Sequence, residues 1–172
     1  MTTANKITIL RVVLIPVFLA LAYTGQKYWA FAVFVLASLS DMLDGYIARH
    51  YNQITDFGKF MDPLADKVLV MAAMCFFVER GCMPGWVLAI VLLREFAVSG
   101  MRLVAVEQGR VIAAAWSGKV KTAVTMVGLC AMLLFSQHAW VNTLVSLLIL
   151  LTTVYSGAEY FYKNRDVFRN VD

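Results

Sequence analysis

Charged residues, cysteine, histidine and proline are all scarce in this chain. Charged residues make up 15% of the 172 positions and hydrophobic residues 61%, whereas a typical soluble domain is about 25% charged and about 45–50% apolar. Three cysteines without metal or redox spacing, and two histidines without paired spacing, argue against a zinc site or a disulfide framework. We expect Cys75 and Cys130 to be small buried packing residues. The composition favours an all-α integral membrane protein.

The apolar stretches are long enough to cross a bilayer, and short polar turns separate them. A transmembrane helix needs about 20 largely apolar residues, and polar residues, glycine and proline mark breaks at 25–27, 80–84 and 136–138. The pattern predicts a single domain over 1–172 with six membrane-spanning helices, at 8–25, 29–49, 58–79, 84–105, 118–136 and 139–161.

Lysine and arginine are distributed unevenly between the two expected sides of the membrane. Only Lys27 and Arg80 fall on the side opposite the termini, and the other 13 of the 15 lie on or near the terminal side. The positive-inside rule makes that side cytoplasmic in a multi-pass protein of the cell membrane. The net charge of +4 then indicates contact with anionic headgroups and substrates, not nucleic acid. We expect Arg11 to be one of the solvated flanking cations.

Four aspartates interrupt the apolar pattern where the second expected helix ends and the third begins. They are Asp41, Asp44, Asp62 and Asp66. Ionisable residues at membrane depth are costly and usually face a cavity, a partner or a metal. Residues three or four apart share a helix face, so two facing helices would bring the four carboxylates together. Oxygen-only ligands suit Mg²⁺ or Mn²⁺, and pairs of such ions promote displacement at phosphorus.

An alternative is a solvated loop whose acids cap helix ends. Pro63 adds a further question, because proline inside a helix removes a hydrogen bond. The third helix therefore either begins later than Gly58 or accommodates Pro63 in its interior.

The segment 41–66 resembles the signature of the CDP-alcohol phosphatidyltransferase family. The matching positions are Asp41, Asp44, Gly45, Ala48, Arg49, Gly58, Asp62 and Asp66. The resemblance implies a six-helix membrane fold in which an alcohol displaces CMP from a CDP-linked donor, at a two-Mg²⁺ site held by the four aspartates and open to the cytoplasm. It makes Asp66 the general base and implies a homodimer. Donor-binding residues would be Asp44, Gly45, Ala48, Arg49 and Gly58.

A second group of charged residues lies around the expected fourth and fifth helices. Its cations, which are candidates to hold the phosphate of a phosphorylated acceptor, are Arg94, Arg102, Arg110, Lys119 and Lys121. The alternative is positive-inside bias together with a buried network of Arg94 and Glu95 that only joins helices.

Three other segments, 5–11, 62–67 and 94–95 with 117–122, resemble one branch of that family. The branch transfers the phosphatidyl group of CDP-diacylglycerol to sn-glycerol 3-phosphate, giving phosphatidylglycerophosphate and CMP in anionic phospholipid biosynthesis. Serine, inositol phosphate and phosphatidylglycerol stay open as acceptors. A metal-ion transporter would also carry spaced intramembrane acids, although Arg49 would obstruct a cation. An intramembrane prenyltransferase is a further alternative, for which six spans are too few.

Overall fold

The chain folds into six long α-helices and one short 3₁₀ helix over the residues described in the computed structural model. It describes residues 3–50, 56–110, 112–113 and 115–168, and side chains at 9–40, 65, 67–110, 112–113 and 115–166. The helices are α1 (Thr3–Tyr23), α2 (Lys27–His50), α3 (Asp56–Glu79), α4 (Gly85–Glu107), α5 (Trp116–Phe135), α6 (Ala139–Lys163) and η1 (Arg165–Phe168). The prediction of an all-α fold is confirmed.

Glycine ends the first and third helices where the sequence indicates turns. Gly25 has φ of +78° and Gly81 has φ of +69°, a left-handed conformation that glycine adopts without steric cost. At each turn the next backbone N–H reaches back to the helix: Gln26 donates to the Leu21 carbonyl at 3.0 Å, and Cys82 donates to that of Phe77 at 2.9 Å. These bonds satisfy carbonyls that a helix end leaves without partners.

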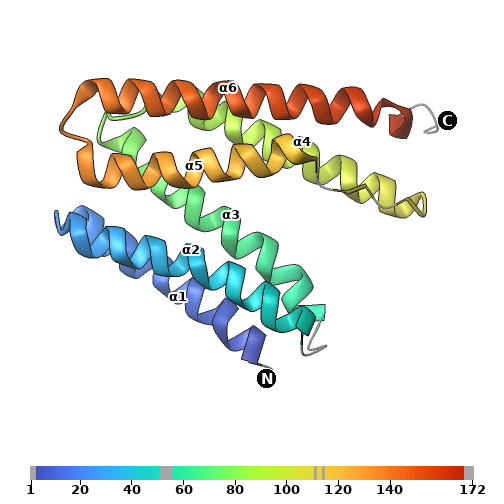
Figure 1. Cartoon of the computed structure of the whole chain (residues 1–172), viewed down its shortest axis with the longest axis horizontal. Coiled ribbons are helices and arrows are strands. Elements are labelled where there is room, and N and C mark those ends of the chain that lie inside the picture. Colours follow the sequence, from blue (N-terminus) through green and yellow to red (C-terminus); the bar gives the residue numbers. More distant parts are fainter. Residues whose placement is uncertain (1–2, 51–55, 111, 114, 169–172) are drawn as a thin grey trace.

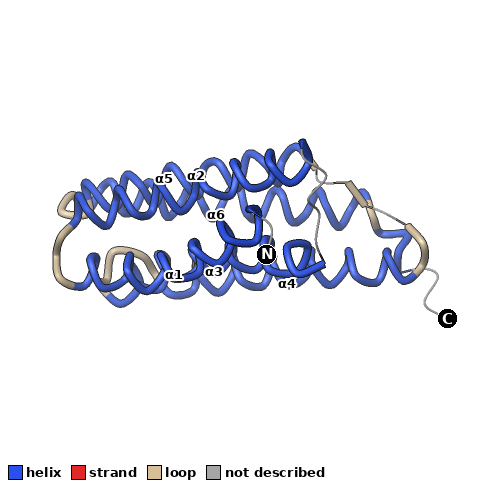
Figure 2. The backbone as a smooth tube through the Cα atoms, turned by 90° about the horizontal axis from the view of Figure 1, so that it is seen from below, coloured by secondary structure: helices blue, strands red, loops and turns tan. Residues whose placement is uncertain are grey.

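The six helices form a closed ring in the order α1, α2, α5, α6, α4 and α3, each contacting the next. Figure 1 shows α1 beside α2 and α5 beside α6, with α3 and α4 joining the two pairs. In the view of Figure 2, α2 and α5 lie on one side while α1, α3 and α4 lie on the other. The turns that follow α1, α3 and α5 gather at one end of the ring, and the segment that carries the aspartates belongs to the other.

The core consists of one buried apolar stripe from each helix. Phe18 of α1 packs on Phe34 of α2 with ring centroids 5.5 Å apart, and Leu69, Ala73 and Phe77 give α3 a buried stripe at four-residue spacing. Cys75 falls outside this stripe and is exposed, so the expectation that it is buried was wrong; Cys130 is half-buried.

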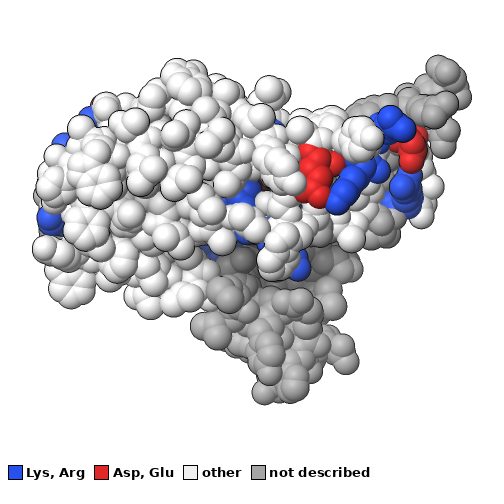
Figure 3. Space-filling model, turned by 45° about the horizontal axis from the view of Figure 1, so that its top comes forward, with Lys and Arg blue, Asp and Glu red and all other residues white. Residues whose placement is uncertain are grey.

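Two helices, α5 and α6, are long and apolar enough to cross a membrane. Within the described residues, the apolar parts of α1 (Ile9–Tyr23) and α2 (Lys27–Ser40) are shorter. On the face drawn in Figure 3, uncharged side chains cover most of the half away from the carboxyl end, with a few cations at its outer edge, and the other charged side chains lie from the centre toward the carboxyl end. A broad uncharged surface with charges gathered beyond it is typical of a surface that contacts lipid.

Candidate active site

An open cavity of about 740 Å³ lies between the helices, with walls from α2, α3, α4, α5 and α6. The α4 side supplies Glu95, Ser99 and Arg102, which follow one another at spacings of four and three residues and so share a helix face. On α5, Lys119 and Ala123 repeat this spacing. The charged and polar residues that interrupt the apolar pattern of α4 therefore face a cavity.

Both helices that carry the aspartate motif adjoin this cavity. Ser38 and Leu39 of α2 line it just before Asp41, and Lys67 of α3 lines it directly after Asp66. The helix positions Asp41, Asp44, Gly45, Ala48 and Arg49 belong to the last turns of α2, and Gly58, Asp62 and Asp66 to the first turns of α3. The side chains of these eight residues lie outside the described ones, so their predicted roles stay predictions.

The third helix is continuous across Pro63. It begins at Asp56 and runs to Glu79, so Gly58, Asp62 and Asp66 occupy one helix at intervals of four residues. The alternative that this helix begins after Gly58 is therefore wrong. The alternative of a solvated loop is also wrong for residues 56–66 of the motif, because these residues are helical.

Glu95 of α4 is the centre of a buried ionic network. Its Oε1 accepts hydrogen bonds from Arg94 Nη1 at 2.8 Å and from Lys121 Nζ at 2.9 Å, and its Oε2 lies 3.8 Å from Lys67 Nζ. The Lys121 side chain is 6% exposed and that of Glu95 14%. Lys67 also donates to Ser99 Oγ at 2.5 Å. One carboxylate thus holds three cations from α3, α4 and α5.

Arg94 lies in the wall of the cavity, where its side chain contacts α5 and α6. Its Nη2 donates to Ser156 Oγ of α6. A β-carbon at Gly118 would lie 3.4 Å from Arg94 Nη2, and one at Gly157 would lie 3.3 Å from Arg94 Cγ, so both glycines make room for this side chain. Within the described part of the chain, its buried Nε has no hydrogen-bond partner. Arg94 lines the cavity and therefore places a positive charge in its wall.

The other candidate cations occupy three different settings. The Nε of Arg102 donates to the Tyr160 hydroxyl at 3.1 Å, and its guanidinium carbon lies 5.6 Å from the centroid of that ring. Lys119 is exposed and lines the cavity. Arg110 lies in the exposed loop after α4 and is not among the lining residues. The structure therefore brings four of the five candidates, Arg94, Arg102, Lys119 and Lys121, to the cavity or directly behind its wall.

Three residues near the site were not on the list of candidates. Lys67 and Tyr160 line the cavity, and Arg11 of α1 is fully buried, its Nε donating to Ser40 Oγ at 3.3 Å. The expectation of a solvated Arg11 was wrong because α2 covers this part of α1. The segments 5–11 and 62–67 contain Arg11 and Lys67, but nothing in the sequence singled out Tyr160.

The described side chains do not by themselves form a metal site. No group of three or more His, Cys, Asp or Glu side chains comes together in the described set, which leaves out those of Asp41, Asp44, Asp62 and Asp66. All four donors would be carboxylate oxygens on two contacting helices. This donor chemistry suits a hard divalent cation.

Comparisons with known proteins agree with the chemistry of this site. The family model described as CDP-alcohol phosphatidyltransferase matches residues 1–155. A Bacillus subtilis (strain 168) protein named CDP-diacylglycerol--glycerol-3-phosphate 3-phosphatidyltransferase is 38% identical, over 96% of both chains. A protein with the same name from Escherichia coli (strain K12) is 41% identical over 79% of this chain and 78% of its own. A probable phosphatidylglycerophosphate synthase of Mycobacterium tuberculosis (strain ATCC 25618 / H37Rv) is 39% identical over 91% of this chain and 78% of its own.

Proposed function

Because the chain belongs to the CDP-alcohol phosphatidyltransferase family, we propose that it transfers the phosphatidyl group of CDP-diacylglycerol to sn-glycerol 3-phosphate. The products are phosphatidylglycerophosphate and CMP. The names of the relatives support this donor and this acceptor. In this chain the proposal rests on the cation-lined cavity that adjoins both motif helices. Such a wall favours a phosphate ester as its ligand.

The six helices cross the cell membrane, with both termini and the active site on the cytoplasmic side. The apolar length of α5 and α6 supports this topology. The charges of α4 are compatible with it, because Arg94, Glu95 and Arg102 line the cavity and need not meet lipid. The excess of lysine and arginine on the terminal side supports the orientation. A homodimer follows from the family resemblance, and light scattering of the detergent-solubilised chain measures it.

Two Mg²⁺ ions, which Mn²⁺ can replace, are held by the motif aspartates Asp41, Asp44, Asp62 and Asp66. The all-oxygen donor set on α2 and α3 supports this choice of metal. When bound, the two ions neutralise the donor pyrophosphate and the charge that develops on the departing CMP.

Asp66 accepts the proton of the acceptor's 1-hydroxyl. As the proton moves, the hydroxyl oxygen forms a bond to the β-phosphorus of CDP-diacylglycerol, and the bond from that phosphorus to the CMP oxygen breaks. Asp66 belongs to α3, one of the two motif helices that adjoin the cavity, and this placement supports the role. Arg49 binds a donor phosphate, and Asp44, Gly45, Ala48 and Gly58 complete the donor site.

The phosphate of the acceptor binds to cations of α4 and α5. Lys119 and Arg102 offer donors at the cavity surface, and Arg94 adds positive charge to the wall. Lys121 is bonded to Glu95 and therefore acts by fixing that carboxylate and, through it, Arg94. Arg110 does not line the cavity. It therefore attracts the acceptor phosphate from a longer distance.

Release of CMP from CDP-diacylglycerol by the detergent-purified chain tests the proposal. We expect release that requires Mg²⁺ or Mn²⁺, stops with EDTA, and is stimulated by sn-glycerol 3-phosphate but not by serine, inositol phosphate or phosphatidylglycerol. Stimulation by one of the other alcohols would replace the acceptor and keep the chemistry. Absence of CMP release with every acceptor, combined with metal uptake into proteoliposomes, would replace the enzyme by a transporter.

A further inference from the structure

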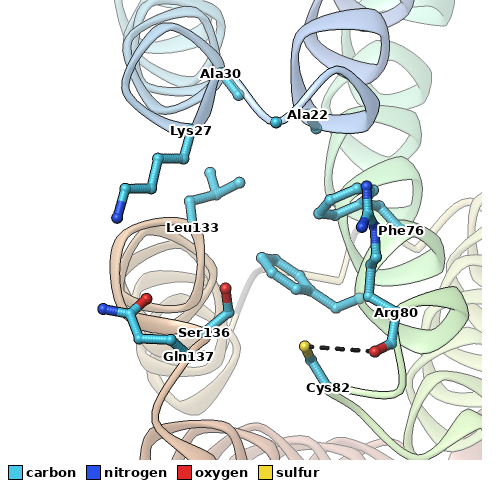
Figure 4. Close-up of a pocket in the computed structure, with 11 residues that line it drawn as sticks. Ala22, Lys27, Ala30, Phe76, Arg80, Cys82, Leu133, Ser136 and Gln137 are labelled. Atoms are coloured by element: carbon cyan, nitrogen blue, oxygen red, sulfur yellow. Dashed lines mark hydrogen bonds between the residues drawn. The ribbon is translucent and has the colours of Figure 1, made fainter.

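A second pocket opens at the end of the helix ring opposite the aspartate motif. It has a volume of about 330 Å³ and lies where the turns after α1, α3 and α5 meet. Figure 4 shows Lys27 and Gln137 on one side of this opening and Arg80 on the other. Three helix pairs therefore contribute to one site that the proposed reaction does not use.

The pocket has an apolar floor and a cationic rim. Phe77 and Ala30 lie at its floor and are buried, whereas Lys27, Arg80 and Gln137 at its rim are exposed. This separation matches a ligand that has a polar, negatively charged group next to hydrocarbon. A free inorganic anion would use the rim alone.

Lys27 and Arg80 are held near the opening by contacts that do not neutralise their positive charge. Arg80 Nη2 donates to the Tyr23 carbonyl at 3.3 Å, and its guanidinium carbon lies 5.3 Å from the centroid of the Phe76 ring. The ammonium of Lys27 lies 5.2 Å from the centroid of the Tyr28 ring. The nearby acid, Glu79, accepts a hydrogen bond from the Tyr23 hydroxyl and is not a lining residue.

The positions of these cations are unusual for the proposed topology. The positive-inside rule disfavours lysine and arginine on the side opposite the cytoplasm, and Lys27 and Arg80 are the two that the sequence places there. Lys27 begins α2 and Arg80 lies in the turn after α3, yet both line the same pocket. A shared anionic ligand explains why both occur at this place.

We propose that this pocket binds the phosphate ester of an anionic glycerophospholipid in the leaflet opposite the active site. The inference rests on the proposed membrane crossing, which puts the pocket at headgroup depth. Arg80 pairs with the phosphate from one side, Lys27 and the Gln137 amide reach the polar headgroup from the other, and the first acyl carbons lie over the apolar floor.

Lipid titration of the full-length chain in detergent, followed by native mass spectrometry, tests this site. We expect phosphatidylglycerol to bind with at least tenfold lower affinity to the Lys27→Gln/Arg80→Gln double variant than to the wild type, with phosphatidylcholine binding unchanged. The Lys27→Arg/Arg80→Lys variant should keep wild-type affinity, because both charges remain. Lys163→Gln, at the other end of the chain, serves as the matched control.

Several results would overturn the assignment. Equal affinities of the wild type and the double variant for phosphatidylglycerol would remove the site. Displacement of bound phosphatidylglycerol by inorganic phosphate or sn-glycerol 3-phosphate, at concentrations near the affinity for the lipid, would show that a soluble phosphate is the ligand. CMP release by the double variant should stay at the wild-type rate, so failure of the lipid site and failure of the proposed enzyme activity are separate outcomes.

Discussion

Replacing Glu95 by Gln should destabilise the protein strongly, because three cations depend on this one carboxylate. Lys121 and Arg94 both bond to Oε1, at 2.9 and 2.8 Å, and their side chains are 6% and 13% exposed. Removing one partner of a buried ion pair costs about 3–5 kcal/mol. We take about 3 kcal/mol, at the low end of that range, because the carboxylate is 14% exposed beside a cavity. For a chain of this size that loss corresponds to a fall in Tm of about 6–12 °C.

Thermal unfolding of the detergent-solubilised variants measures this loss. Glu159→Gln is the matched control, since Glu159 pairs with Lys163 on the surface of α6 and exposed pairs contribute little. Glu95→Gln/Lys121→Met removes both members of one pair and fills the space with an apolar side chain. Its Tm should fall by less than the sum of the two single changes, since the uncompensated buried ammonium is gone.

A Glu95→Gln variant that melts within 2 °C of the Glu159→Gln control would refute the buried network as a source of stability. Strict additivity of the Glu95→Gln and Lys121→Met changes would also contradict it, because residues that share a buried hydrogen bond are expected to be coupled by at least about 0.5 kcal/mol.

Three other changes test the site and the helix packing. Lys119→Ala should raise the KM for sn-glycerol 3-phosphate at least fivefold and leave that for CDP-diacylglycerol unchanged, because it removes a cavity cation; unchanged acceptor kinetics would exclude the role. Asp66→Asn should abolish CMP release with Tm and helical circular dichroism retained, and residual turnover near the wild-type rate would exclude a general base. Gly128→Ala should lower Tm despite the higher helix propensity of alanine, because its β-carbon would lie 2.7 Å from Val145 Cγ1. Adding Val145→Ala should restore stability, and a Gly128→Ala chain at least as stable as wild type would contradict the clash.

The sequence predicts the helices well because long apolar runs form them and residue types that favour turns end them. Gly25 and Gly81 stop two helices in the conformation that only glycine adopts easily, so the turns could be found from residue type alone. The burial of Arg11 could not be predicted in this way, because a cation in the first turns of a helix gives the same sequence pattern whether it is solvated or packed. Its burial depends on the contact with Ser40 of α2, which is a tertiary feature.

The family could be predicted because its signature is local. All eight signature positions lie within 41–66, and the match of the family model over 1–155 confirms the membership. The roles of the individual aspartates depend on how their side chains meet across α2 and α3, and these side chains lie outside the described residues. Their functions stay predictions for the kinetic experiments to decide.

The cations proposed to bind the acceptor phosphate show most clearly what could not be predicted from the sequence. Lys119 and Lys121 are two residues apart, which places them on different sides of α5 because successive helical residues are rotated by about 100°. Lys119 lines the cavity, whereas Lys121 turns into the interior and bonds to Glu95. The two interpretations of this group, a phosphate site and a network that joins helices, therefore apply to different residues of the same group. Arg94 belongs to both, since it bonds to Glu95 and also lines the cavity.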